Sequence, residues 1–526
     1  MSLLVGSERG TRFSPLKLDN PKKEDNCRFL QGHGKEGQLH SDLFQEQMPQ
    51  HSTSRTVSFD TSPGGVIRRI LTLAWNVRTP ADICKSGYVD QGMKIGLDHK
   101  GQNVKSQTAC SEEVRDFYER MPYPSPLTSL DDHLEHYSNP ERRRAMFHLM
   151  WPTERPRANQ EILIAGCGTS QAARYALREP NAHITAIDVS ETCLDHTRRL
   201  QQKYELGNLE LHQLSILDVQ ALRKTFDQVV CTGVLHHLAD PDLGLQSLRN
   251  VLKPQGAMQI MVYASYGRTG IYMLQAYCRL LGITPSNQEL QDLSATLNCL
   301  PKDHPLTHLL HKGKDFRHPE ALADALLHPL DRAFRVPQIY EWLEKCGMSF
   351  GRWIEQAPYL PHCGVVAKSP HAERLTSLSS PLQHAAVELF RGTMVSHSFT
   401  AYRNDRSGAS QPITFAGDRW REYVPIALPW TVCVRENLPP GSVAVLINPA
   451  HRFTDLIFPI NSLENRLLGG IDGKRTLAEI LDFVTVAGNN GRRAGPSFFE
   501  RLWQYDQIVF DASRPGEASL ESRQLQ

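Results

Sequence analysis

The stretch from Glu161 to Ala172, EILIAGCGTSQA, carries the clearest structural signal in the sequence. Its apolar run at 162–165 is typical of a strand that is buried on both faces of a parallel sheet. The run leads into Gly166 and Gly168, which allow a sharp turn and a close approach to a ligand because neither carries a Cβ. Residues 171–177 then read as a helix whose free N–H groups point back at the turn. The stretch therefore predicts a strand, a glycine turn and a helix that together face a ligand.

An acidic residue follows this turn at the spacing of a nucleoside site. Asp188 ends a second apolar run at 184–187, and an acid about twenty residues beyond the turn can accept both hydroxyls of a ribose. The dinucleotide fingerprint needs a third glycine where this chain has Gln171. We therefore expect a nucleoside cofactor without a pyrophosphate, whose amino-acid tail lies over the turn.

Here the residues resemble the first motif of the class I S-adenosylmethionine-dependent methyltransferases, in particular bacterial members with an undefined substrate. The family often has a further glycine at the position of Ser170. The segment 232–238, TGVLHHL, is similar to the family's fourth motif, and the resemblance covers about residues 111–368. It implies that the cofactor S-adenosyl-L-methionine is bound by Gly166, Cys167, Gly168, Asp188, Val189, Ser215, Ile216, Thr232 and Gly233.

The adenine end of this site departs from the family pattern. The family usually has an acid just beyond the third strand, where this chain has Ser215 followed by Ile216, with Asp218 further on. A hydroxyl accepts a weaker hydrogen bond than a carboxylate. The polar adenine contact is therefore open between Ser215 and Asp218.

The resemblance implies a doubly wound, Rossmann-like sheet of seven strands whose last strand is antiparallel. We expect a methyltransferase domain over 107–370, with a lid at 111–150, a core at 160–263, a helical insertion at 264–335 after strand five, and the last strand pair within 348–368. The members of that pair are predicted at 348–356 and 363–367. In the lid, the FYE and PYP segments resemble those that lie over the substrate mouth in related enzymes.

No general base is identified by the sequence, and no metal site is expected. Candidate catalytic or substrate-contacting side chains are His237, Tyr266, Arg268 and Tyr118. Each has a structural alternative: the histidine pair at 236–237 as part of a turn, Arg268 as a surface group and Tyr118 as a packing residue. His328 and Asp331 are read as pocket residues or as a salt-bridged turn.

The other parts of the chain carry less specific patterns. Residues 1–106 are expected to be mostly disordered, with one helix at 66–77, and 514–526 to be a disordered tail. The connecting region 371–442 has no assigned fold. The phrase IDGKRTLAEIL in 443–513 resembles the small winged-helix modules of the PqqD type, which hold peptides or partner proteins. A small α+β winged-helix-like domain is therefore expected there.

Composition limits the function classes. The net charge is +1, so no strongly basic field recruits nucleic acid. The eleven cysteines include no CxxC pair, and no apolar run approaches a membrane span or a signal peptide. We expect a cytoplasmic methyltransferase that transfers a methyl group to a small-molecule acceptor by direct displacement. The alternatives are a peptide or protein substrate or partner delivered by the C-terminal module, and a non-catalytic scaffold.

Overall fold

The structure is a computed structural model that describes residues 104–513, apart from gaps at 132–133, 135–137, 313–315, 317, 407–411 and 486–490. The expectations of disorder at both ends and of a helix at 66–77 lie outside the described residues. In the part of the chain that is described, no helix is both long and apolar enough to cross a bilayer.

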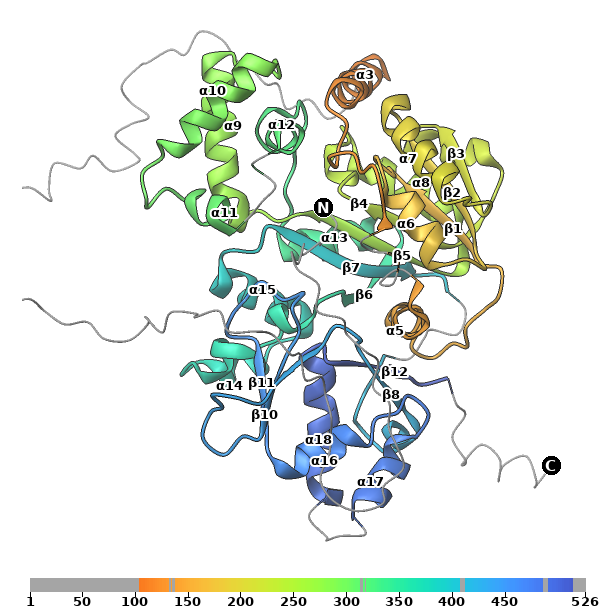
Figure 1. The fold of residues 1–526 in the computed structure, drawn as a ribbon, viewed down its shortest axis with the longest axis vertical. Helices are drawn as coiled ribbons and strands as arrows, with labels where there is room; N and C mark the ends of the chain where they lie inside the picture. Colours follow the sequence, from red (N-terminus) through yellow and green to blue (C-terminus); the bar gives the residue numbers. More distant parts are fainter. Residues whose placement is uncertain are drawn as a thin grey trace, which may run out of the picture. The chain divides into compact units, whose positions relative to one another are not determined.

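A seven-stranded mixed sheet forms the centre of the part of the structure that precedes residue 404 (Figure 1). Its strands are β1 (Glu161–Ala165), β2 (His183–Asp188), β3 (Leu209–Gln213), β4 (Phe226–Thr232), β5 (Leu252–Tyr263), β6 (Met348–Trp353) and β7 (Ser396–Arg403). Their order is β3-β2-β1-β4-β5-β7-β6. β1 to β5 run parallel, and β7 is antiparallel to both β5 and β6. The predicted Rossmann-like sheet with an antiparallel last strand is confirmed.

The position predicted for the last strand is wrong. Residues 363–367 were expected to form it, but Gly364–Lys368 is the short 3-10 helix η8, and β7 begins only at Ser396. Two helices, α14 (Ala372–Thr376) and α15 (Ser380–Arg391), precede β7. The sequence of β7 looks too polar for a central strand, yet the buried His397 is bonded to Glu388 and Tyr359. Because tertiary partners satisfy its polar groups, a strand without an apolar run can lie inside the sheet.

Alternate residues of each central strand pack on opposite faces of the sheet. Leu163 and Ala165 of β1 lie in a core with α8 (Pro241–Val251) and α13 (Val336–Lys345). Ile162 and Ile164 lie in a second core with α6 (Gln171–Arg178) and α7 (Glu191–Lys203). Burying one such side chain stabilises the fold by about 1.5–3 kcal/mol. The unbroken apolar run of β1 thus reflects burial on both faces.

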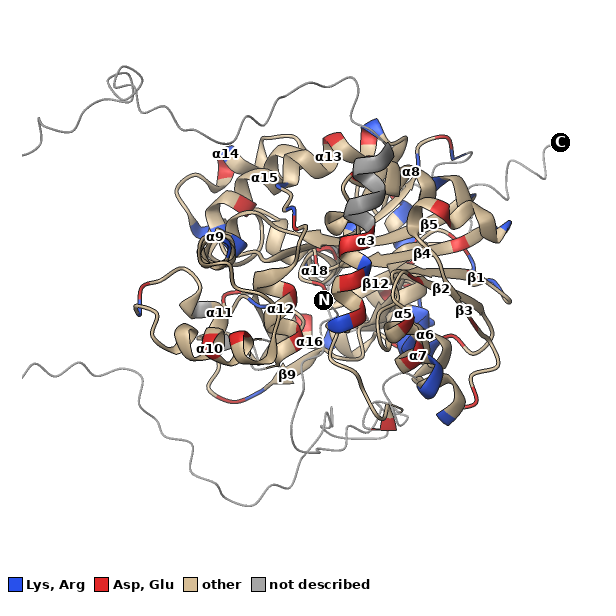
Figure 2. Ribbon diagram, turned by 90° about the horizontal axis from the view of Figure 1, so that it is seen from above, with Lys and Arg blue, Asp and Glu red and all other residues tan. Residues whose placement is uncertain are grey.

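The insertion after β5 is helical, as expected. It contains α9 (Thr269–Leu281), α10 (Asn287–Asn298), α11 (Thr307–Lys312) and α12 (Pro319–Leu327), drawn as a green group in Figure 1. Leu293 and Leu322 belong to a core of its own, which Phe117 of α3 (Val104–Arg120) also enters. Acidic and basic residues are interspersed along the described ribbon in Figure 2.

The C-terminal part contains two small sheets and three helices. Its elements are β8 (Val424–Ala427), β9 (Val432–Val434), β10 (Ala444–Ile447), β11 (Ile457–Ile460), α16 (Ser462–Gly469), α17 (Leu477–Thr485), α18 (Gly491–Gln504) and β12 (Ile508–Asp511). β10 pairs with β9 and β11, and β12 pairs with β8. The unit expected at 443–513 therefore includes strands from the predicted connector. Its likeness to a winged helix stays a prediction.

One helix expected in the lid instead contacts this C-terminal part. α5 (Pro140–Met150) begins after Asn139, whose side chain accepts from the N–H groups of residues 141 and 142. Ala145 and Leu149 of α5 pack in one core with Ile426 and Val509. The lid over the glycine turn is thus limited to the end of α3 and the segment that follows it.

Candidate functional site

The glycine turn after β1 has the geometry that the sequence predicts. Gly166 and Gly168 have φ values of +73° and +56°, in the left-handed region that favours glycine. The N–H groups of Gly166 and Cys167 donate to the carbonyl of Ile187 at 2.9 and 3.0 Å. A Cβ on Gly166 would lie 2.3 Å from Cγ2 of Val234. The turn is therefore held tightly between the ends of β2 and β4.

Asp188 lies directly beside this turn. Its Oδ2 accepts from the N–H of Gly168 at 2.8 Å, and its Oδ1 accepts from the N–H of Ser190 at 3.0 Å. Burial raises the pKa of Asp188, while these two donors act to lower it. Each carboxylate oxygen has a second lone pair, so ribose hydroxyls can still donate to it. The carboxylate has a turn-holding role that sequence reasoning missed.

Gln171 stands where the dinucleotide fingerprint has its third glycine, and its side chain closes the turn. Nε2 of Gln171 donates to Oγ1 of Thr232 at 2.7 Å. This bond links the start of α6 to the end of β4, beside Gly233. The third glycine of a dinucleotide site serves close helix–strand packing at this point. The arrangement fits a phosphate-free nucleoside better than a dinucleotide.

The adenine end is less open than expected. Oγ of Ser215 accepts from the N–H of Leu217 at 3.2 Å and caps the 3-10 helix η3 (Ile216–Leu222). Ile216 is 4% exposed and belongs to the core, whereas Asp218 is exposed. Since the Ser215 hydroxyl already caps the helix, Asp218 is the more accessible of the two polar candidates.

Two further predicted cofactor residues contribute little polar surface. Cys167 is 1% exposed, and burial raises the pKa of its thiol. Val189 is half-buried, and its carbonyl accepts from Nε2 of Gln213 at 3.2 Å. Their contribution to a cofactor site would come from the backbone and from shape.

The segment after α3 covers the glycine turn. A Cβ on Gly168 would meet the carbonyl oxygen of Tyr123 at 2.7 Å and Cδ of Pro124 at 3.0 Å. The hydroxyl of Thr169 donates to the carbonyl of Pro124 at 2.7 Å. Glu119 accepts from the first N–H groups of α7. The lack of a side chain at Gly168 is therefore required by this segment, whatever ligand binds.

Tyr118 is joined to the end of β5 through a buried carboxylate. The hydroxyls of Tyr118 and Tyr263 donate to the two oxygens of Asp324, at 2.9 and 3.1 Å. Asp324 lies on α12 and is 3% exposed. Sequence reasoning missed it, although an acid beyond the first turn of the largely apolar PEALADALL helix is a usable signal. The lid, the sheet and the insertion thus meet at one polar point.

Two stacked imidazoles lie beside this carboxylate. Nδ1 of His237 donates to the carbonyl of Leu330 at 2.6 Å, and Nδ1 of His328 accepts from the N–H of the same residue at 3.0 Å. The ring centroids are 3.8 Å apart. Burial lowers the pKa of His237 to about 4 and that of His328 to about 3. Both imidazoles are therefore neutral at pH 7, and Tyr118 contacts both rings.

Arg268 and Tyr266 do not take the places considered for them. Arg268 is 4% exposed, bonds Asp331 at 2.8 Å and lies 3.5 Å over the ring of Tyr263. The surface role is therefore wrong, and a substrate carboxylate would have to displace Asp331. Tyr266 is half-buried in η5 (Tyr266–Arg268). Among the described residues, no hydrogen bond or ring contact joins its side chain to His237 or His328.

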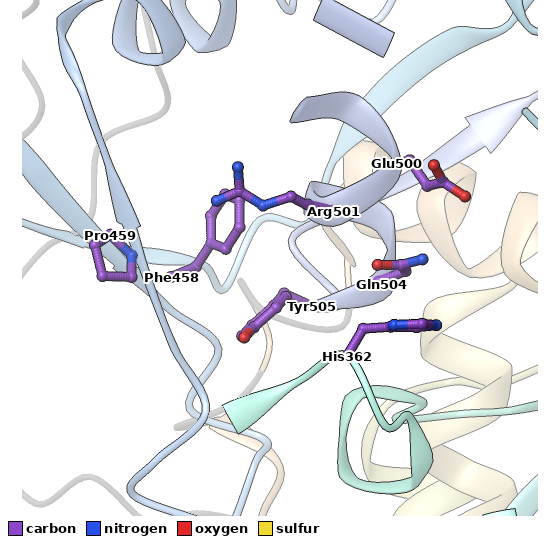
Figure 3. Close-up of a pocket in the computed structure, with 7 residues that line it drawn as sticks. All are labelled: His362, Phe458, Pro459, Glu500, Arg501, Gln504 and Tyr505. Atoms are coloured by element: carbon purple, nitrogen blue, oxygen red, sulfur yellow. The ribbon is translucent and has the colours of Figure 1, made fainter. Parts of the chain in front are cut away.

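A separate cavity of about 420 Å³ lies in the C-terminal part. Figure 3 shows its lining: His362, Phe458, Pro459, Glu500, Arg501, Gln504 and Tyr505. The guanidinium of Arg501 lies 4.7 Å over the ring of Phe458 and bonds Glu464 at 3.0 Å. None of the lining residues comes from the cofactor strands, so this cavity is distinct from the glycine-turn site.

Comparison with known proteins agrees with the fold of the central part. Residues 163–258 match the family model of the methyltransferase domain. A protein of Synechococcus sp. is 33% identical over 240 residues, which are 43% of this chain and 56% of the relative. An uncharacterized methyltransferase of Mycobacterium bovis is 28% identical over 124 residues, 23% of this chain and 60% of the relative. The chain thus matches little more than half the length of these relatives.

A solved structure extends the similarity of fold beyond that segment. The structure of PKMT2 from Rickettsia typhi has a TM-score of 0.52 at 16% identity and covers 75% of this chain and 78% of its own. A second structure of that protein is a complex with AdoHcy, at 14% identity and a TM-score of 0.52. The similarity supports the overall fold. The central part of this chain accordingly has the Rossmann-like fold of methyltransferases, and residues 163–258 within it are similar to methyltransferase domains.

Proposed function

We propose that the protein is an S-adenosylmethionine-dependent methyltransferase that acts on a small-molecule acceptor. The observation that carries this proposal is the glycine turn of Gly166 and Gly168, anchored by Asp188, in a sheet of methyltransferase topology. If the chain used this fold only as a non-catalytic scaffold, the glycine turn would not be needed. The hydrogen bonds that hold the turn are nevertheless all formed.

The cofactor, when bound, supplies a methyl group already activated by a positive sulfur. The residues that would hold it are those of the turn, with Asp188 at the ribose and Asp218 or Ser215 near the adenine. The protein then has to align the acceptor and exclude water, which can contribute about 7–11 kcal/mol in well-oriented systems. The polar group of Tyr118, His237, Tyr263 and Asp324 is the proposed acceptor side, because it follows the carboxyl ends of β4 and β5.

The burial of this group supports a small acceptor. His237 is 3% exposed and Tyr263 4%, and the lid and α12 both contribute to the enclosure. A peptide or protein acceptor delivered by the C-terminal part is the alternative, supported by the separate cavity against α18. The two differ in one test: Arg501→Glu, in that cavity, should leave turnover of a small acceptor unchanged and reduce turnover of a delivered peptide.

Binding of S-adenosylhomocysteine to the full-length protein tests the cofactor assignment. A ligand at one hundred times its dissociation constant should stabilise the protein by about 2.7 kcal/mol, and NAD should produce no shift. Asp188→Asn removes a charge that accepts hydrogen bonds, worth about 1.5–3 kcal/mol, so calorimetry should show affinity reduced at least tenfold. Asp195→Asn, an exposed acid on α7, is the matched control.

Two outcomes would contradict these assignments. A protein that shows no thermal shift with S-adenosylhomocysteine is not a methyltransferase of this class. Unchanged affinity in Asp188→Asn would remove Asp188 from the cofactor site while leaving the class in place.

A further inference from the structure

We infer that His237 and His328 form a paired subsite for a neutral hydroxyl group, so that the acceptor atom is oxygen. The inference rests on the proposed methyl transfer and narrows its substrate class. It follows from the hydrogen bond that each imidazole makes to Leu330 through Nδ1, and from the Nε2 atom of each ring, which has no such bond.

The two imidazoles are held as opposite tautomers. Nδ1 of His237 faces the carbonyl of Leu330, so it must carry the proton, and its Nε2 is left with a lone pair. Nδ1 of His328 receives the N–H of Leu330, so its lone pair is used there and the proton of the neutral ring sits on Nε2. One backbone residue thus sets a hydrogen-bond acceptor and a donor side by side.

The two Nε2 atoms remain for a ligand. Both are buried, and among the described residues neither has a hydrogen-bond partner. The ring centroids are 3.8 Å apart and the ring planes are tilted by 34°, and both rings direct Nδ1 at Leu330. Their Nε2 edges therefore both face away from that residue. Two unpaired polar atoms in one buried place are costly unless a ligand pairs with them.

A hydroxyl satisfies both atoms and still keeps a lone pair for reaction. Its proton donates to Nε2 of His237, and one oxygen lone pair accepts from Nε2–H of His328. The second lone pair then forms the bond to the methyl carbon, while the carbon–sulfur bond breaks with its electrons on sulfur. The hydroxyl proton passes to Nε2 of His237 and on to solvent. The atoms and charges balance without another reactant.

Other acceptor groups fit this pair less well. A neutral amine has one lone pair, which the methyl transfer uses, so Nε2–H of His328 is left unpaired. An ammonium group directs a proton at that N–H. A carboxylate only accepts, so it opposes the lone pair on His237. Each mismatch leaves a buried polar atom without a hydrogen-bond partner, which weakens binding.

The tautomers can be measured without any ligand. Long-range proton–nitrogen spectra of the wild-type, full-length protein at pH 7 should show His237 protonated on Nδ1 and His328 on Nε2. The signals are assigned by their loss in His237→Gln and His328→Gln. Finding the same tautomer in both rings would overturn the inference.

Ligand preference is tested with three probes of one skeleton: benzyl alcohol, benzylamine and ethylbenzene. Benzyl alcohol should shift both Nε2 signals and bind about tenfold more tightly than benzylamine, as expected for one lost hydrogen bond. The His237→Gln and His328→Gln proteins should lose this preference. His384→Gln is the matched control, because burial also lowers the pKa of His384 to about 4 and its ring hydrogen-bonds Tyr340, away from His237 and His328.

Binding of each probe is measured with and without S-adenosylhomocysteine. Failure of S-adenosylhomocysteine to bind is then detected separately, and it would contradict the proposed function but not the hydroxyl subsite. Equal binding of benzylamine, or no effect of benzyl alcohol on either Nε2 signal, would overturn the hydroxyl subsite.

Discussion

Replacement of Asp506 should disrupt the link between the C-terminal part and the catalytic sheet. Asp506 is 2% exposed and has a positive φ of 51°. One carboxylate oxygen accepts from Nη2 of Arg352, a residue of β6, at 2.9 Å. The other accepts from the N–H of Ala357 at 2.9 Å and from Nε2 of His451 at 3.0 Å. A single side chain therefore joins the segment after β6 to the C-terminal strands.

The expected magnitude follows from what Asp506→Ala leaves behind. The side chain of Arg352 is only 16% exposed, and removing one partner of a buried ion pair destabilises a protein by about 3–5 kcal/mol. The lower end of this range applies, because Glu355 lies near enough to attract the guanidinium. Asp506→Asn keeps one acceptor oxygen and a side chain that tolerates positive φ, so its effect should be smaller.

Urea unfolding followed by tryptophan fluorescence measures this effect. The first transition should move to lower urea in Asp506→Ala, less in Asp506→Asn, and little in the control Glu191→Gln. Glu191 forms an exposed pair with Arg198, and such pairs contribute under about 1 kcal/mol. Affinity for S-adenosylhomocysteine should be retained below the transition. If the first transition of Asp506→Ala had the same urea midpoint as that of Glu191→Gln, the proposed link would be refuted.

Three other outcomes follow from the structure. Gly168→Val should reduce both stability and S-adenosylhomocysteine affinity, because its Cβ would meet the carbonyl of Tyr123 at 2.7 Å; calorimetry showing full affinity would contradict this packing. Truncation after residue 436 should aggregate on size exclusion, since it leaves β8 and β9 without their partner strands, whereas truncation after 406 should keep cofactor binding. The pKa of His237 and of His384 is lowered to about 4 in the folded protein, below about 6.5 in the unfolded chain. The unfolded state then binds more protons, so the melting temperature should fall as pH drops from about 6.5 towards 4; a flat profile would contradict the burial of these rings.

Several elements could be located from local sequence, and others could not. The helix caps at Ser190 and Asp240 depend only on local sequence, because a cap bonds N–H groups two or three residues away. The place of β7 in the central sheet could not be predicted in this way, because its polar residues are paired by Glu388 and by Tyr359, which lie elsewhere in the chain. The pairing of the short strands β8 and β9 was not predicted either, since their partners β12 and β10 come later in the sequence.

The sequence by itself determined the strand, glycine turn and helix around EILIAGCGTSQA, and the class of cofactor that they favour. These features depend on a short apolar run, on the lack of a Cβ and on the spacing to Asp188, all of which are local. Only the tertiary structure brought Tyr118 to Asp324, which lies 206 residues away, and placed the ring of His237 against the ring of His328. Hydrogen bonds between such distant residues depend on how the lid, sheet and insertion pack, and no pattern within one segment encodes that packing.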